Sequence, residues 1–168
     1  KQNGSVVYNA TRDGIPCVLK GYQVTKNTDH AHVEAEVRQL HRLRHANIVE
    51  VSALFTCKGS ISELIYIQMP KYEQDMKDWL MEQRRHGEVD AESRRKLLRG
   101  ALRAMQRVHE FCLVHNDIKL SNFLVSKDGD AVLSDFELCR TEMPGGGTTF
   151  AVGGTQIYMS PERLKDKQ

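Results

Sequence analysis

The first part of the chain alternates between apolar and polar residues in short segments that are typical of β-strands. Four segments have this pattern: residues 4–10, 16–20, 48–55 and 63–69. Asp13 and Gly14 form a turn signal between the first two segments, and residues 57–60 form another between the last two. The pattern therefore predicts two β-hairpins.

A helix is predicted between the two hairpins, over residues 29–43. Its apolar residues recur at helical spacing and fall on one face: Val33, Val37, Leu40 and Leu43. Asp29 is expected to cap its N-terminus.

The second part of the chain changes to helical periodicity, over residues 74–83 and 91–110. The longer segment has an apolar stripe made of Leu97, Leu98, Ala101, Leu102, Met105 and Val108. Its basic residues are expected to form a solvated face. Two short apolar runs follow at 123–125 and 131–133, separated by a turn signal. The fold class predicted is α+β, with a sheet and one helix first and a mainly helical part after it.

Composition agrees with an ordinary globular protein. The 168 residues are 40% hydrophobic and 27% charged, enough for one core or two small lobes. The net charge of +2 gives no argument for nucleic acid or for a membrane, so neither is expected as a partner. Four scattered cysteines without framework spacing favour a reducing, intracellular setting, cytoplasmic or nuclear. No apolar run approaches the length of a membrane span.

Four residues that suit phosphoryl transfer lie between positions 117 and 135. Asp117 and Lys119 are two residues apart, Asn122 follows three later, and Asp135 ends the second apolar run. Phosphoryl transfer needs a group that orients the hydroxyl, a cation for the moving phosphate, and oxygen ligands for Mg²⁺. These residues supply all three.

The stretch H-N-D-I-K-L-S-N at residues 115–122, with D-F-E at 135–137, resembles the catalytic loop H-R-D-x-K-x-x-N and the D-F-G motif of eukaryotic protein kinases. The position of Lys119 is similar to that in the Ser/Thr kinases. The resemblance implies a protein-kinase-like fold, in which an N-lobe with an antiparallel sheet and the αC helix joins a mainly helical C-lobe. It also implies ATP and Mg²⁺ as cofactors.

The resemblance divides the chain into three parts. Residues 1–69 are identified as the N-lobe, which begins within the Gly-rich loop, of which only Gly4 remains. Residues 70–73 are the hinge, and residues 74–168 form a partial C-lobe with the catalytic loop and activation segment. Because the family's domain is considerably longer, the chain is expected to lack most of the C-terminal lobe.

The resemblance also assigns roles. Lys20 is expected to bind the ATP phosphates, with Glu36 on the predicted helix as its ion-pair partner. Asp117 is expected to orient the substrate hydroxyl and Lys119 to neutralise the γ-phosphate, while Asn122 and Asp135 bind Mg²⁺. The remaining nucleotide-binding residues implied are Val7, Val18, Met69, Lys71, Tyr72 and Leu124. His115 and Phe136 are expected to be structural.

The end of the chain resembles an activation segment. A glycine-rich stretch at 144–149 is followed by G-T-Q-I-Y-M-S-P-E at 154–162, which is similar to the G-T-x-x-Y-x-A-P-E close of that segment. Together with Lys119, Thr155 favours Ser or Thr in a protein substrate. A regulatory protein is a possible second partner.

Two residues depart from the kinase pattern. Asn116 stands where arginine is usual, which makes the loop of the non-RD type and predicts activity without loop phosphorylation through this position. Glu137 stands in place of the glycine of D-F-G. These departures support one alternative, a choline- or ethanolamine-type kinase, whose motifs H-N-D-x-x-x-x-N and D-F-E are also similar. The expected lack of most of the C-terminal lobe supports another, a weak or inactive kinase-like regulatory module.

Overall fold

The computed structural model describes residues 5–24, 30–58, 63–87, 90–141, 154–161 and 164. Several positions with sequence-based expectations lie outside these residues: Gly4, Asp29, residues 59–60, residues 144–149 and Glu162. The chain forms two compact units, Lys1–Tyr72 and Glu73–Gln168. The division falls within the segment 70–73 that is expected as a hinge.

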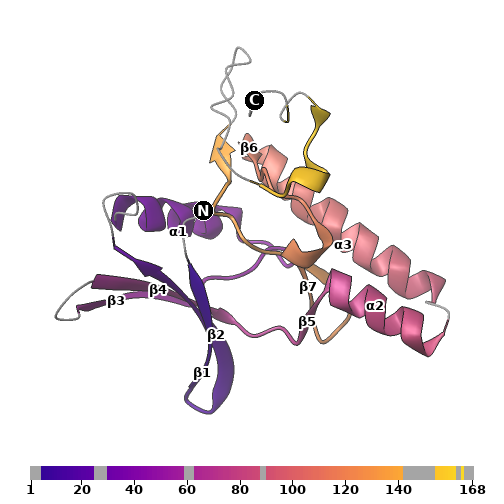
Figure 1. Cartoon of the computed structure of the whole chain (residues 1–168), viewed down its shortest axis with the longest axis horizontal. Helices are drawn as coiled ribbons and strands as arrows, with labels where there is room; N and C mark the ends of the chain where they lie inside the picture. The colour runs from indigo at the N-terminus through magenta and orange to yellow at the C-terminus, as the bar shows by residue number, and fades with distance from the viewer. Residues whose placement is uncertain are drawn as a thin grey trace. The chain divides into compact units, whose positions relative to one another are not determined.

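The first unit is an antiparallel sheet with one helix (Figure 1). Its elements are β1 (Val6–Arg12), β2 (Ile15–Gln23), α1 (His30–Leu43), β3 (Ala53–Lys58) and β4 (Glu63–Pro70). The strand order is β1-β2-β4-β3, so the second hairpin joins the first through β4. Asp13 has a φ of 51° and Gly14 a φ of 79°, as expected for the tight turn between β1 and β2.

One face of this sheet carries four of the predicted nucleotide-binding residues. Val7 pairs in register with Lys20, and Val18 pairs with Met69. Paired residues of antiparallel strands point to the same face, and so do residues two apart along one strand. Val7, Val18, Lys20 and Met69 therefore share a face, the one on which α1 contributes Glu36 beside Lys20.

The opposite face of the sheet carries an aromatic group. The rings of Phe55 and Tyr66 stack with centroids 5.6 Å apart, and Tyr8 meets Tyr66 edge-on at 6.2 Å. Gly21 lies beneath them, where an added Cβ would come 3.0 Å from the Tyr66 ring. A glycine is therefore needed for the rings to lie this close to β2.

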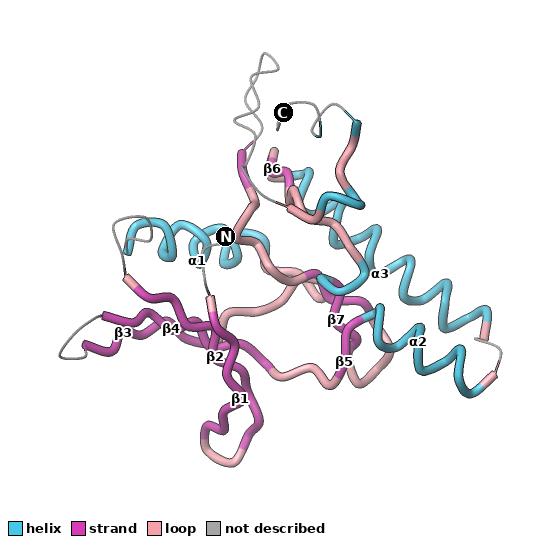
Figure 2. The backbone as a smooth tube through the Cα atoms, viewed as in Figure 1, coloured by secondary structure: helices cyan, strands magenta, loops and turns pink. Residues whose placement is uncertain are grey.

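Within its described residues, the second unit has two long helices and only short strands (Figure 2). Its helices are α2 (Met76–His86), α3 (Ala91–Glu110) and two 3-10 turns, η1 (Leu120–Asn122) and η2 (Gln156–Tyr158). Its strands are β5 (Gln74–Asp75), β6 (Leu113–Val114), β7 (Phe123–Val125), β8 (Ala131–Leu133) and β9 (Arg140–Thr141). The strands form a β5-β7-β8 sheet and a β6-β9 pair, all antiparallel.

Aspartates begin both long helices. Asp75 accepts a hydrogen bond from the backbone N–H of Asp78, and Asp90 accepts from those of Glu92 and Ser93. Hydrogen bonds from Ser93 are the main cause of the lowered pKa of Asp90. These caps fix where α2 and α3 start.

Helix α3 packs on the hairpin that follows the catalytic-loop motif. Its buried residues are Leu97, Gly100, Ala104 and Val108, and all three residues of β8 are buried with them.

None of the helices in the described part of the chain is long and apolar enough to cross a membrane. The α+β fold class predicted from the sequence is confirmed.

Two details of the prediction are wrong. The strand expected over 48–55 begins at Ala53, because the apolar residues Val49 and Val51 are buried in an irregular segment rather than in a ladder. Leu98 and Leu102 were expected in the stripe of α3 but are 59% and 61% exposed. Small residues at Gly100 and Ala104 let the helix approach β8 instead, which turns the buried face away from the two leucines.

Candidate active site

The catalytic-loop motif lies between β6 and β7. Its first residue, His115, is 1% exposed and anchors the motif in the interior of the second unit. Its Nδ1 accepts the backbone N–H of Asp117 at 3.3 Å, so the proton lies on Nε2, which donates to the carbonyl of Ser134 at 3.0 Å. Its ring meets Phe136 edge-on, with centroids 4.9 Å apart. Burial lowers the pKa of His115 and favours the neutral imidazole. These contacts fit the structural role expected for His115.

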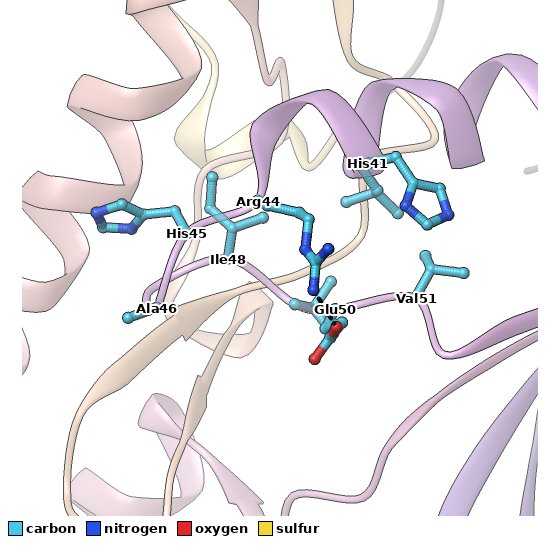
Figure 3. A pocket seen from close by; sticks show the side chains of 9 residues that line it. His41, Arg44, His45, Ala46, Ile48, Glu50 and Val51 are labelled. Carbon is cyan, nitrogen blue, oxygen red and sulfur yellow. Dashed lines mark hydrogen bonds and ion pairs between the residues drawn. The ribbon is translucent and has the colours of Figure 1, made fainter.

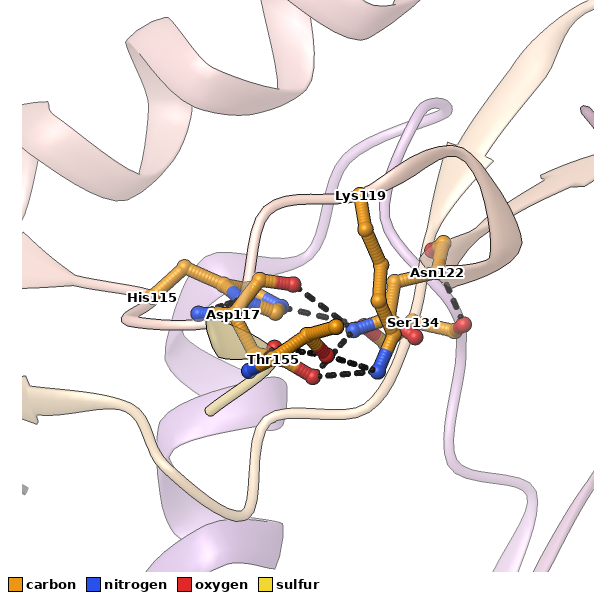
Figure 4. A network of polar contacts seen from close by, with 6 residues as sticks. All are labelled: His115, Asp117, Lys119, Asn122, Ser134 and Thr155. Carbon is orange, nitrogen blue, oxygen red and sulfur yellow. Dashed lines mark hydrogen bonds and ion pairs between the residues drawn. The ribbon is translucent and has the colours of Figure 1, made fainter. Parts of the chain in front are cut away.

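The Asp117 carboxylate is the centre of a polar network (Figure 4). Its Oδ1 accepts both the backbone N–H and the hydroxyl of Thr155, each at 2.9 Å. Its Oδ2 accepts from Lys119 Nζ at 2.6 Å and from Asn122 Nδ2 at 3.1 Å. Lys119 also donates to the Thr155 hydroxyl at 3.0 Å. Four donors thus fix one carboxylate, which offers about four acceptor positions.

This network decides the ionisation of Asp117, which is 6% exposed. Burial acts to raise the pKa of the carboxyl group. The hydrogen bonds from Lys119 and Thr155 act in the opposite direction and together outweigh burial, so the pKa of Asp117 is lowered. Asp117 is therefore an ionised, well-oriented and weakly basic carboxylate.

Asn122 and Asp135 are linked through Ser134. The N–H and hydroxyl of Ser134 both donate to the carbonyl of Asn122, at 2.8 and 3.0 Å. Asp135 follows Ser134 directly, with a φ of 62°. The Nδ2 of Asn122 is occupied by Asp117, so the atom that Asn122 can offer to a cation is its amide oxygen. A carboxylate and an amide oxygen suit Mg²⁺.

Asn116 stands where the kinase pattern has arginine, and the structure gives it a role that this departure did not predict. Its φ of 68° is in the left-handed region, which asparagine tolerates better than most residues. Its Nδ2 donates to the carbonyls of Val114 at 3.2 Å and Leu138 at 3.0 Å. The side chain therefore ties the catalytic loop to the segment after Asp135, beside the β6-β9 pair.

In the first unit, Lys20 and Glu36 lie together on the helix-covered face of the sheet. Lys20 Nζ is 3.4 Å from Glu36 Oε1, and both side chains are buried. The Tyr22 hydroxyl donates to Glu36 Oε2 at 2.9 Å. The lysine is therefore held in a defined position within this unit.

The chain matches the family model of the protein kinase domain over residues 2–168. It is 32% identical over 95% of its length to an LRR receptor-like serine/threonine-protein kinase of Arabidopsis thaliana. The chain belongs to the protein kinase domain family.

Two further relatives of the kinase domain are similar along most of this chain. A probable serine/threonine-protein kinase of Arabidopsis thaliana is 35% identical over 77% of the chain. A bifunctional serine/threonine-protein kinase/NEDD4-like E3 ubiquitin-protein ligase of Dictyostelium discoideum is 26% identical over 93%. The chain spans 33% or less of the length of these three relatives.

The other residues expected to bind nucleotide in this kinase domain differ in exposure. Val7 is 61% exposed, while Val18 and Met69 are half-buried on the same sheet face. After β4, Lys71 is exposed and Tyr72 is half-buried, where burial, with Glu50 as a lesser cause, raises the pKa of Tyr72. The second unit holds Leu124 half-buried in β7.

A cavity of about 290 Å³ lies in the first unit at the C-terminal end of α1, between residues 40 and 51 (Figure 3). Arg44 and Glu50 form an ion pair of 3.2 Å across its rim. None of the residues predicted to act in phosphoryl transfer lines it.

Three contributors to the kinase site were missed from the sequence. Tyr22 was not singled out, although its position two residues after Lys20 on a strand places both on one face. Thr155 was linked only to substrate choice and not to the Asp117 carboxylate. Ser134 carries no sequence signal, because its two bonds to Asn122 depend on how the hairpin closes.

Proposed function

We propose that this kinase domain transfers the γ-phosphate of ATP to serine or threonine hydroxyls of protein substrates. The observation that carries the proposal is the Asp117 carboxylate, which is buried, ionised and bonded to both Lys119 and Thr155. A carboxylate held in this way suits a loose transition state, which requires an oriented hydroxyl more than a strong base.

Nucleotide binding is assigned to the helix-covered face of the first unit's sheet. Lys20 would bind the phosphates of ATP, and its contact with Glu36 supports this role because it fixes the ammonium. Val7, Val18 and Met69 provide apolar area on the same face for the adenine ring. Lys71 and Tyr72 in the first unit and Leu124 in the second are the other residues proposed to bind the nucleotide.

A divalent metal would be held by the Asn122 amide oxygen and the Asp135 carboxylate. The donor set fits Mg²⁺, since both are hard oxygen ligands and Ser134 fixes the backbone of one beside the other. When bound, Mg²⁺ would neutralise the negative charge on the phosphate oxygens. Asn122 itself also holds Asp117, so it would serve both the metal and the hydroxyl-orienting group.

Asp117 and Lys119 would act on the reacting groups. Asp117 would accept the hydrogen bond of the substrate hydroxyl and so aim its oxygen, and Lys119 would neutralise charge on the transferred phosphate. All four acceptor positions of Asp117 are used by protein donors. We expect the substrate hydroxyl to take the position of the Thr155 hydroxyl, because that O–H can rotate away.

The Thr155 contacts favour a protein substrate over a small alcohol. Thr155 belongs to the segment that resembles the close of a kinase activation loop, and it reaches Asp117 directly. Protein substrates, with a regulatory protein as a further partner, are therefore proposed. We also propose an intracellular setting, cytoplasmic or nuclear, since no disulfide joins the cysteines of the described residues.

The test is a comparison of binding and transfer. Mg·ATP should raise the melting temperature of the parent and not of Lys20→Met, and the parent should label a generic Ser/Thr protein from γ-labelled ATP. Binding without transfer would favour the regulatory module instead. Transfer to choline alone would favour the small-alcohol kinase, and absence of binding would contradict nucleotide use altogether.

A further inference from the structure

Tyr22 lies on β2 two residues after Lys20, so both side chains are on the same face of the sheet. It is 2% exposed and pairs in register with Ile65 of β4. Lys20 Nζ lies 5.4 Å from the centroid of its ring, within the range of a cation–π contact. A phenylalanine would fill the same space, so packing alone does not account for the hydroxyl.

The hydroxyl of Tyr22 holds the carboxylate that holds Lys20. It donates to Glu36 Oε2 at 2.9 Å, whereas Lys20 Nζ lies 3.4 Å from Oε1 of the same group. The tyrosine contact is the shorter of the two. Each oxygen of Glu36 is therefore bonded to a different residue of β2, and all three side chains are buried.

The bonds from Tyr22 and from Lys20 to Glu36 respond differently when a nucleotide phosphate binds. The Lys20 ammonium must then be shared between Glu36 and the phosphates, which weakens its hold on Glu36. A buried carboxylate that loses part of its cation is destabilised unless another donor remains. The Tyr22 hydroxyl is that donor, because it does not compete for the nucleotide.

We propose that Tyr22 is a positioning residue that fixes Glu36, and through Glu36 helix α1, so that Lys20 stays aimed at the nucleotide phosphates. This inference rests on the proposed binding of ATP phosphates by Lys20. The alternative is a core tyrosine whose hydroxyl finds the nearest acceptor without functional consequence.

The experiment measures the dissociation constant of Mg·ATP for Tyr22→Phe and for a matched control, Tyr66→Phe. Tyr66 lies on the neighbouring strand but on the opposite face, over Gly21, and loses the same atom. Tyr22→Phe should weaken binding about tenfold, as expected when a hydrogen bond to a charged group is lost. Tyr66→Phe should stay within about twofold. Equal affinities of the two variants would overturn the inference.

A double-mutant cycle separates positioning from packing. In a Glu36→Leu background, which lacks the carboxylate that accepts from the hydroxyl, Tyr22→Phe should change Mg·ATP affinity by less than about twofold. An undiminished tenfold effect in that background would show that Tyr22 acts without Glu36 and would overturn the inference.

A readout without nucleotide keeps the inference separate from the proposed function. If the parent does not bind Mg·ATP, the proposed function fails, and amide hydrogen exchange of α1 then tests Tyr22. Exchange in α1 should be faster in Tyr22→Phe than in Tyr66→Phe, because Glu36 has lost the hydrogen bond from the Tyr22 hydroxyl. Equal exchange rates would overturn the role of Tyr22.

Discussion

Thr155 donates both its backbone N–H and its hydroxyl to the same oxygen of Asp117, 38 residues earlier in the chain, each at 2.9 Å. The segment that begins at Gly154 is thus bonded directly to the carboxylate proposed to orient the substrate. The two contacts make the ionisation and the orientation of Asp117 depend on the segment that contains Thr155.

Removing the Thr155 hydroxyl should weaken Asp117 as an orienting group. Thr155→Val keeps the shape of the side chain but loses one donor to the carboxylate, so the pKa of Asp117 should rise. The Thr155 hydroxyl also accepts from Lys119 Nζ at 3.0 Å, and Thr155→Val would leave that lysine less well positioned, so we expect turnover to fall about tenfold. Carbon-detected NMR titration of the Asp117 carboxyl measures the pKa shift, and steady-state phosphate transfer measures turnover.

Thr155→Ser is the control for this prediction. It keeps the hydroxyl and the backbone N–H, so its titration and turnover should stay close to those of the parent. A Thr155→Ser variant as impaired as Thr155→Val would mean that the methyl group, not the hydrogen bond, matters.

Gly154 should tolerate no side chain. Its φ is 99°, and an added Cβ would lie 3.0 Å from the backbone oxygen of Asn116 and 2.9 Å from Met159 Cε. The methionine end can move, but the backbone oxygen cannot, so Gly154→Ala should displace Thr155 and reduce phosphate transfer at least tenfold. Gly129→Ala is the matched control, since Gly129 also has positive φ, 79°, but open space.

Both glycine variants should lose roughly 1 kcal/mol of unfolding free energy from backbone strain. Only Gly154→Ala should lose transfer. Unchanged transfer in Gly154→Ala would show that the Thr155–Asp117 contact is not needed for the reaction.

Protonation of His115 should destabilise the protein below neutral pH. Burial lowers the pKa of this imidazole in the folded state, while in the unfolded chain it is about 6.5. The unfolded state therefore binds the proton first, so stability is complete above about pH 6.5 and falls as the pH drops below it. The slope contributed reaches about 1.4 kcal/mol per pH unit.

Urea unfolding at several pH values between 5 and 8 measures this slope. His115→Asn should flatten it, whatever its stability at pH 8, whereas His109→Asn, at an exposed position of α3, should leave it as in the parent. Identical slopes in the two variants would contradict a buried neutral His115.

Asn116 should stabilise the catalytic loop through its own hydrogen bonds, with no phosphorylated residue involved. Asn116→Gly keeps the left-handed backbone but loses the bonds to Val114 and Leu138, so we expect a loss of about 1 kcal/mol in unfolding free energy. Asn116→Ala should lose about 1 kcal/mol more, because alanine is strained at a φ of 68°. Equal stability of the three proteins in urea would contradict this role.

The same residue bears on regulation. Asn116 presents no guanidinium to a phosphate, so replacing Thr148 and Thr149 by alanine should leave transfer unchanged. A loss of transfer that is restored by acidic residues at these positions would show that the loop is phosphate-dependent after all.

The sequence predicted the parts of this protein that depend on local pattern. The α1 face with Val33 and Leu43 and the hairpin from β1 to β2 follow directly from apolar spacing. The resemblance implied Glu36 as the partner of Lys20, and the structure has Glu36 buried beside Lys20, whereas Glu34 on the same helix is exposed.

Predictions failed where tertiary packing decides. Val49 and Val51 alternate with polar residues as in a strand, but they are buried in an irregular segment. Their alternating pattern reflects burial and not the pairing of a strand. The stripe of α3 was assigned by counting large apolar residues, whereas the close contact with β8 selects the small residues Gly100 and Ala104. Glycine and alanine carry little weight in a hydrophobic pattern.

Polar partners that belong to no motif could not be predicted. The Tyr22 hydroxyl and the two donors of Ser134 find their acceptors only after the chain has closed on itself. Their distances along the chain from those acceptors follow no period. Such contacts have to be observed, even where the reacting residues themselves are evident from a motif.

The most direct test of the central claim is γ-phosphate transfer from Mg·ATP to a Ser/Thr protein by the parent and by Asp117→Asn. The asparagine keeps the shape of the side chain but loses the charge that would accept the substrate hydroxyl. We predict that the parent labels the protein, and that Asp117→Asn is at least about 100-fold slower while its Mg·ATP affinity stays within twofold. Equal rates for the two proteins, or no transfer by a parent that binds Mg·ATP, would contradict the account.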